Sequence, residues 1–83
     1  MIEFQNFEQG ISMKWVDNQL NIVREIKFYG SNTPEATRAL TEAFSFEIKQ
    51  MREKHPTLTK EALENWLSEI QERVIRGEFG HLL

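Results

Sequence analysis

Apolar residues alternate with polar ones from residue 11 to residue 28, which is typical of strands that bury one face of a sheet. The residues predicted to face the core are Ile11, Met13, Trp15, Leu20, Ile22, Ile26 and Phe28. Asp17 and Asn18 tolerate a positive φ, so they predict a two-residue hairpin turn that pairs Trp15 with Leu20. A turn centred one residue later would change the partners but keep the faces.

A first strand is predicted from Ile2 to about Glu8, followed by a turn in which Gly10 supplies a positive φ. This turn would place Phe4 beside Trp15 and complete a three-stranded antiparallel meander. The residues predicted on the opposite, open face are Glu3, Gln5, Phe7, Ser12, Lys14, Val16, Asn21, Val23, Glu25, Lys27 and Tyr29. Because several of them are apolar, this face is a candidate contact surface.

The hydrophobic period changes from two to about 3.6 after residues 30–32, and it predicts helices near residues 34–54 and 60–76. Residues that favour helix ends stand at the expected positions. They are Thr33, Pro34, Pro56, Thr59 and Gly77. The predicted fold class is therefore α+β, a three-stranded antiparallel meander followed by two helices packed on one of its faces (βββαα).

The whole chain, residues 1–83, is predicted to be one domain, with Trp15, Phe44 and Trp66 in its core. Residues 1–30 form the sheet, residues 33–77 form the helical pair, and residues 78–83 form an apolar tail. This tail is too apolar to be a solubilising end. It either folds back on the core or docks onto a neighbouring molecule.

Arg24 breaks the alternation, because it stands between Ile22 and Ile26 at a position predicted to face the core. A β-bulge, or a strand end where the guanidinium reaches water, would explain it. The other interpretation is a partly buried ion pair with a carboxylate of the covering helix. Glu47 lies within the apolar arc of the first helix, so a structural ion pair between Arg24 and Glu47 is predicted on this interpretation.

The chain is mildly acidic, with thirteen acidic and ten basic residues and a net charge of −3. This balance makes nucleic acid an improbable partner, because phosphate neutralisation dominates the affinity for duplex DNA. The absence of cysteine excludes disulfides and fits the cytoplasm. No signal peptide and no membrane-spanning segment are expected, since no long apolar run occurs.

No motif for catalysis, a metal or a cofactor is present in the sequence. The only histidines, His55 and His81, neighbour no nucleophile and have no zinc-ligand spacing. No phosphate-binding glycine loop occurs. We therefore expect no enzymatic activity, no cofactor and no metal site.

We interpret the chain as a non-catalytic module that binds another protein, of the kind that phages and mobile elements carry as small inhibitors or accessory proteins. The predicted partner-binding residues are Phe7, Val23, Tyr29, Ile75, Phe79 and Leu82. One alternative is a structural homodimer that uses the tail or the open sheet face. Another is single-stranded nucleic acid bound to that face, with Phe7 and Tyr29 stacking on bases near Lys14 and Lys27.

Overall fold

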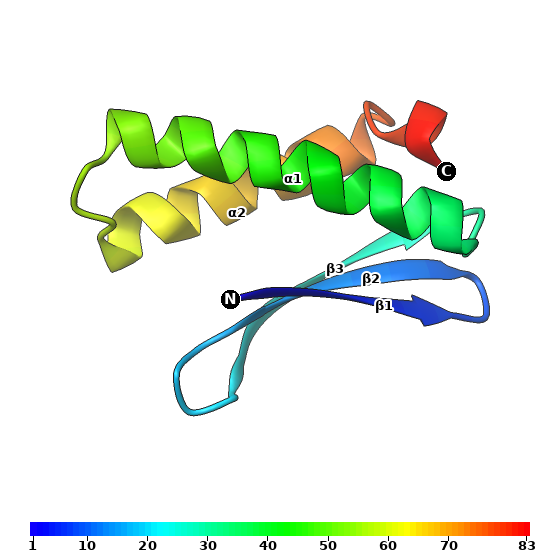
Figure 1. The fold of residues 1–83 in the computed structure, drawn as a ribbon, viewed down its shortest axis with the longest axis horizontal. Coiled ribbons are helices and arrows are strands. Elements are labelled where there is room, and N and C mark those ends of the chain that lie inside the picture. Colours follow the sequence, from blue (N-terminus) through cyan, green and yellow to red (C-terminus); the bar gives the residue numbers. More distant parts are fainter.

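The computed structural model describes residues 1–83, which form a sheet covered on one face by two helices (Figure 1). The elements are β1 (Ile2–Phe7), β2 (Gly10–Val16), β3 (Ile22–Tyr29), α1 (Pro34–Lys54), α2 (Lys60–Ile75) and a 3₁₀ helix, η1 (Gly80–Leu82). The strands are antiparallel in the order β1-β2-β3. The predicted βββαα class is confirmed. Neither helix is long and apolar enough to cross a membrane.

Both long helices begin at the threonines that the sequence indicates. The Thr33 hydroxyl accepts a hydrogen bond from the Ala36 amide at 3.2 Å, and the Thr59 hydroxyl accepts one from the Ala62 amide at 3.1 Å. Each bond satisfies one of the amides that a helix start leaves without a partner. The helix starts are therefore determined by local sequence.

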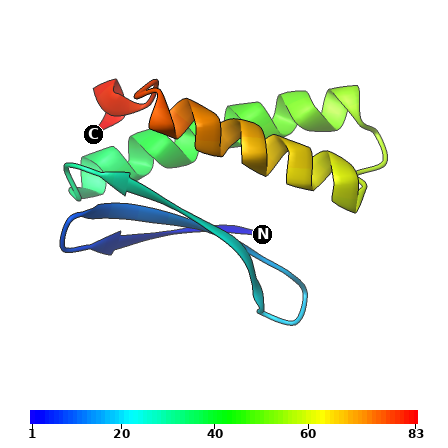
Figure 2. The ribbon, with the colours of Figure 1, turned by 180° about the vertical axis from the view of Figure 1, so that it is seen from behind.

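The end of α2 turns the chain back over the core through a Schellman motif at Gly77, whose φ is +80°. The Glu78 amide donates to the Arg73 carbonyl, and the Gly77 amide donates to the Val74 carbonyl. The following residues, including η1, lie against the N-terminal part of α1 (Figure 2). The tail thus folds back on its own chain.

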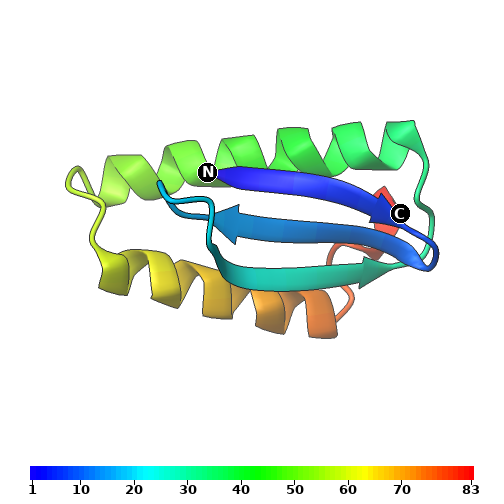
Figure 3. The same ribbon diagram turned by 90° about the horizontal axis from the view of Figure 1, so that it is seen from below.

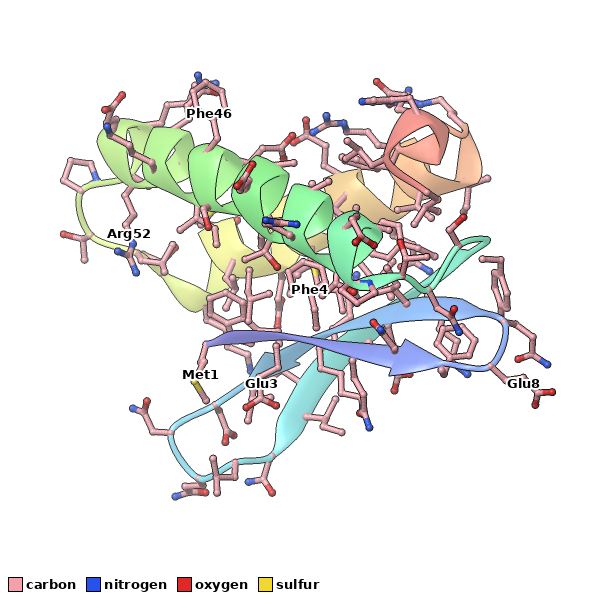
Figure 4. All side chains as sticks on the ribbon, turned by 45° about the vertical axis from the view of Figure 1, so that its right-hand side comes forward. Met1, Glu3, Phe4, Glu8, Phe46 and Arg52 are labelled. Atoms are coloured by element: carbon pink, nitrogen blue, oxygen red, sulfur yellow. The ribbon has the colours of Figure 1, made fainter.

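The register of β1 against β2 differs from the prediction. Phe4 pairs with Met13, not with Trp15, because the turn consists of Glu8 and Gln9 and Gly10 is already part of β2. Gly10 does not have a positive φ. A slip of two residues exchanges partners without exchanging faces, so Phe4 still points toward the helices and Glu3 away from them (Figure 4).

The β2–β3 hairpin is also longer than predicted. Its loop spans Asp17–Asn21, where one oxygen of the Asp17 carboxylate accepts hydrogen bonds from the amides of Gln19 and Asn21. Leu20 has a φ of +64° and is 74% exposed, so it is a loop residue and does not pair with Trp15. The predicted two-residue turn and the core position of Leu20 are both wrong.

A β-bulge at Val23 shifts the end of this hairpin. Trp15 pairs with Arg24 while Val16 pairs with Ile22, which leaves Val23 without a partner. The shift explains why Ile22, predicted to face the core, is exposed. The bulge that Arg24 suggested in the sequence is therefore present, next to that residue.

The core is built around aromatic rings from both layers. Phe44 and Trp66 are buried as predicted, and their ring centroids lie 6.2 Å apart. Trp15 is only partly buried and packs its ring against Trp66 from the margin of the core, with 6.4 Å between centroids. Trp15, predicted in the core, therefore lies at its margin.

Candidate functional site

The sheet face that the helices leave uncovered is the candidate functional site, and it ends in an aromatic pair. Phe7 and Tyr29 lie on either side of Gly10 in one row across the strands. Their rings meet edge to face with centroids 5.8 Å apart, because Gly10 has no side chain to separate them. Tyr29 is 65% exposed, and the Lys27 ammonium lies 5.5 Å from the centre of the Phe7 ring.

The middle of the open face carries balanced charge. Lys14 pairs with Glu3 on one side and with Glu25 on the other, and Ser12 pairs with Gln5 and Lys27 in the next row. The Lys14 ammonium donates to the Gln5 side-chain oxygen at 2.8 Å. The charged residues of this region are Glu3, Lys14, Glu25 and Lys27. Their formal charges cancel.

The far end of the open face is apolar again, where Met1 and Ile22 flank Val16. Met1 and Val16 exchange two backbone hydrogen bonds, and Val16 pairs with Ile22. Met1, Ile22 and Val23 are all exposed, and Figure 4 shows Met1 pointing away from the helices. Met1 and Ile22 were not predicted as contact residues. The alternation indicates a core position for Ile22, and the bulge at Val23 turns this residue outward.

The structure separates the residues predicted to bind a partner. Phe7, Val23 and Tyr29 share the open face, whereas Ile75 lies exposed at the end of α2. Phe79 is only 6% exposed, and its ring stacks on Phe44 with centroids 5.4 Å apart. Its assignment as a contact residue is therefore wrong. Leu82 is partly buried against the same core.

The predicted ion pair between Arg24 and Glu47 does not form. Arg24 donates to the Ser68 hydroxyl at 3.1 Å, so it reaches the flank of α2 from the edge strand. Glu47 instead accepts a hydrogen bond from Arg73 of α2. The prediction found a carboxylate that needs a cation but assigned the wrong one, since the nearest basic side chain comes from the second helix.

Arg73 joins α1, α2 and the tail. Besides Glu47, its guanidinium lies 4.9 Å from the centre of the Phe79 ring, and its Nε lies 3.7 Å from Glu78. Its side chain is mostly buried, so these contacts are less screened by water than those of a surface pair. They fasten the tail to the helices.

Replacing Arg73 by methionine is expected to lower the free energy of unfolding by about 1–2 kcal/mol, because Glu47 loses its partner and Phe79 its cation. Arg76→Met is the matched control, since Arg76 lies mainly in solvent three residues later, and we expect a change within about 0.5 kcal/mol. Urea denaturation measures both. Equal losses in the two variants would refute the role assigned to Arg73.

A groove lies between α1 and α2 on their outer side. This groove of about 290 Å³ has Met51 and Trp66 among its lining residues, together with polar side chains such as Lys54, His55 and Glu69. No group of three or more His, Cys, Asp or Glu side chains is placed to hold a metal ion. No hydrogen bond joins His55 or His81 to a hydroxyl or a carboxylate. The groove thus carries both acidic and basic side chains.

Comparison with known proteins gives no match at the level of family models, curated proteins or solved structures.

Proposed function

We propose that the chain is a non-catalytic protein-binding module that acts by occupying the surface of another protein with the open face of its sheet. The observation that carries this proposal is that the two-layer fold leaves one sheet face uncovered, with apolar side chains at both ends. Exposed apolar groups gathered on one face are typical of contact surfaces. A small inhibitor or accessory protein, of the kind that phages and mobile elements carry, would work in this way.

The charge of the open face favours a protein over single-stranded nucleic acid. A nucleic-acid groove needs an excess of cations along the backbone path, whereas the two lysines of this face are matched by Glu3 and Glu25. Lys27 also lies over the Phe7 ring that would have to stack on a base. A homodimer held by the tail is disfavoured as well, because Phe79 is buried within its own chain.

The double variant Val23→Lys/Tyr29→Ser is expected to reduce partner recovery at least tenfold while leaving the fold intact. Both side chains are exposed, so their replacement removes contact area without opening the core. The assay is a tagged pull-down from the native host, with and without nuclease, quantified by mass spectrometry.

Phe46→Ser is the matched control, because Phe46 is 61% exposed on α1 and points away from the sheet (Figure 4). It should leave partner recovery unchanged. Recovery that disappears on nuclease treatment would favour nucleic acid instead. Equal loss in the Phe46 variant, or no loss in the sheet variant, would refute the open face as the contact surface.

A further inference from the structure

The outer edge of β3 carries backbone groups without hydrogen-bond partners. Met1 and Val16 exchange both of their backbone hydrogen bonds, and the Gly30 amide donates to the Gln9 carbonyl. In an antiparallel sheet the bonding side alternates along each strand, so even-numbered residues of β2 bond to β1 and odd-numbered ones to β3. Within β3, Arg24, Ile26 and Phe28 therefore bond inward. The amides and carbonyls of Glu25, Lys27 and Tyr29 point outward.

The end of β1 is held by side-chain hydrogen bonds to the segment that precedes α1. The Asn6 side chain donates to the Asn32 carbonyl at 2.8 Å and accepts from the Thr37 hydroxyl at 2.7 Å. The Asn32 side chain in turn donates to the Phe7 carbonyl. These bonds tie the end of β1 to the segment that enters α1. The side-chain hydrogen bond made from β3 to a helix is that of Arg24 with Ser68, near the opposite end of the strand.

A groove of about 210 Å³ runs beside the free edge of β3. One wall consists of Lys27, Phe28 and Tyr29. The side chains of consecutive strand residues point to opposite faces of the sheet, so three consecutive residues can line one groove only along the edge of the strand. The other wall comes from the end of α2 and the tail. Its residues are Val74, Gly77, Phe79, Gly80 and Leu83. The groove is thus placed to take an apolar side chain from a chain lying beside β3.

We propose that the β3 edge binds an extended peptide segment of the partner as an added antiparallel strand, with one apolar side chain in this groove. The inference rests on the proposed protein-binding function and states how the partner would bind, as a strand added to the sheet. Backbone bonds to Glu25, Lys27 and Tyr29 would supply affinity, while cross-strand pairs would supply specificity. The preferred segment has an acidic residue opposite Lys27, a basic residue opposite Glu25 and an apolar residue opposite Phe28.

A second copy of the chain fits this edge less well than a lone strand. If two β3 strands paired antiparallel with Ile26 opposite Ile26, Glu25 of each copy would face Lys27 of the other, so the charges would match. However, α2 runs along β3 and contacts it (Figure 3). Paired strands lie about 4.8 Å apart, whereas packed helices need about 8–10 Å. Two copies of α2 would therefore collide, but a peptide without a helix would not.

The first test is amide hydrogen exchange of the free protein followed by NMR. The amides of Glu25 and Lys27 should exchange at least tenfold faster than those of Ile26 and Phe28, because only the latter pair is bonded to β2. Similar protection of all four amides would show that the edge is already covered and would overturn the proposal.

The second test uses the capped peptide Val-Leu-Glu-Thr-Lys-Thr-Val, designed so that its Leu faces Phe28, its Glu faces Lys27 and its Lys faces Glu25. The matched control exchanges Glu and Lys within the peptide. The first peptide should bind about threefold to tenfold more tightly and should slow exchange of the Glu25 and Lys27 amides. The protein variant Glu25→Lys/Lys27→Glu should reverse the preference between the two peptides.

The outcomes separate this inference from the function on which it rests. Three results would each overturn the edge-strand mode. They are binding of neither peptide, binding that shifts resonances away from β3, and a peptide preference that Glu25→Lys/Lys27→Glu does not reverse. The open-face proposal would still stand if Val23→Lys alone, an exposed position outside the groove, abolished partner recovery. Conversely, peptide binding at the edge with unchanged partner recovery in the Val23→Lys variant would refute the open face and retain the edge.

Discussion

Replacement of Phe44 by alanine is expected to lower the free energy of unfolding by about 3–5 kcal/mol, as other deletions of a buried phenyl ring do. Phe44 of α1 is 1% exposed and lies between the sheet, α2 and the tail. Its ring contacts Phe4 of β1, Phe28 of β3, Trp66 of α2 and Phe79 of the tail. A domain of this size has a total stability of roughly 4–12 kcal/mol, so the expected loss is about a quarter of the total or more.

Phe46→Ala provides the control for Phe44→Ala, because it removes the same ring from the same helix two residues later. Phe46 lies in solvent, and its loss should change stability by no more than about 0.5 kcal/mol. Urea denaturation followed by tryptophan fluorescence compares the two variants. A loss below about 1 kcal/mol for Phe44→Ala would mean that this ring is not the centre of the core.

The helices could be predicted almost to the residue, because the signals that start and stop them are local. Thr33 and Thr59 cap the helix starts as expected, and Gly77 lies at the C-terminal turn of α2. A threonine acts on amides three residues away in any tertiary context. The change of hydrophobic period between sheet and helices is equally local, so the fold class followed from it.

The strand register could not be predicted, because the alternation is insensitive to a slip of two residues. Phe4 faces the core whether it pairs with Trp15 or with Met13, and only the turn geometry separates the two. The β2–β3 loop is held by the Asp17 carboxylate, a contact that lengthens it beyond a two-residue turn. The bulge at Val23 then moved Ile22 out of the predicted core.

The candidate site was half predictable for a related reason. Phe7, Val23 and Tyr29 were assigned to the open face because faces survive errors of register. The burial of Phe79 and the pairing of Glu47 with Arg73 depend on how the tail and α2 return over α1. Those contacts join residues far apart in sequence, and no periodic pattern encodes them.

Replacement of Gly10 by alanine is expected to lower the free energy of unfolding by about 2–4 kcal/mol, although this glycine has no positive φ. A Cβ atom added to Gly10 would lie 1.9 Å from the carbonyl oxygen of Phe28 and 2.9 Å from its carbonyl carbon. Both are backbone atoms of the paired strand, so no rotation of a side chain can relieve the overlap. The strands must separate locally.

Gly80→Ala is the control for Gly10→Ala, because a Cβ added there meets no atom within 4 Å. It should be neutral or slightly stabilising, since alanine restricts the unfolded chain. The Gly10 variant should also lose exchange protection at the Phe28 amide, where the β2–β3 ladder would open, while α1 amides far from the sheet keep theirs. Equal stability of the two variants would show that β2 and β3 can move apart at Gly10 without loss of stability. The close approach of their backbones would then not determine the register of the sheet.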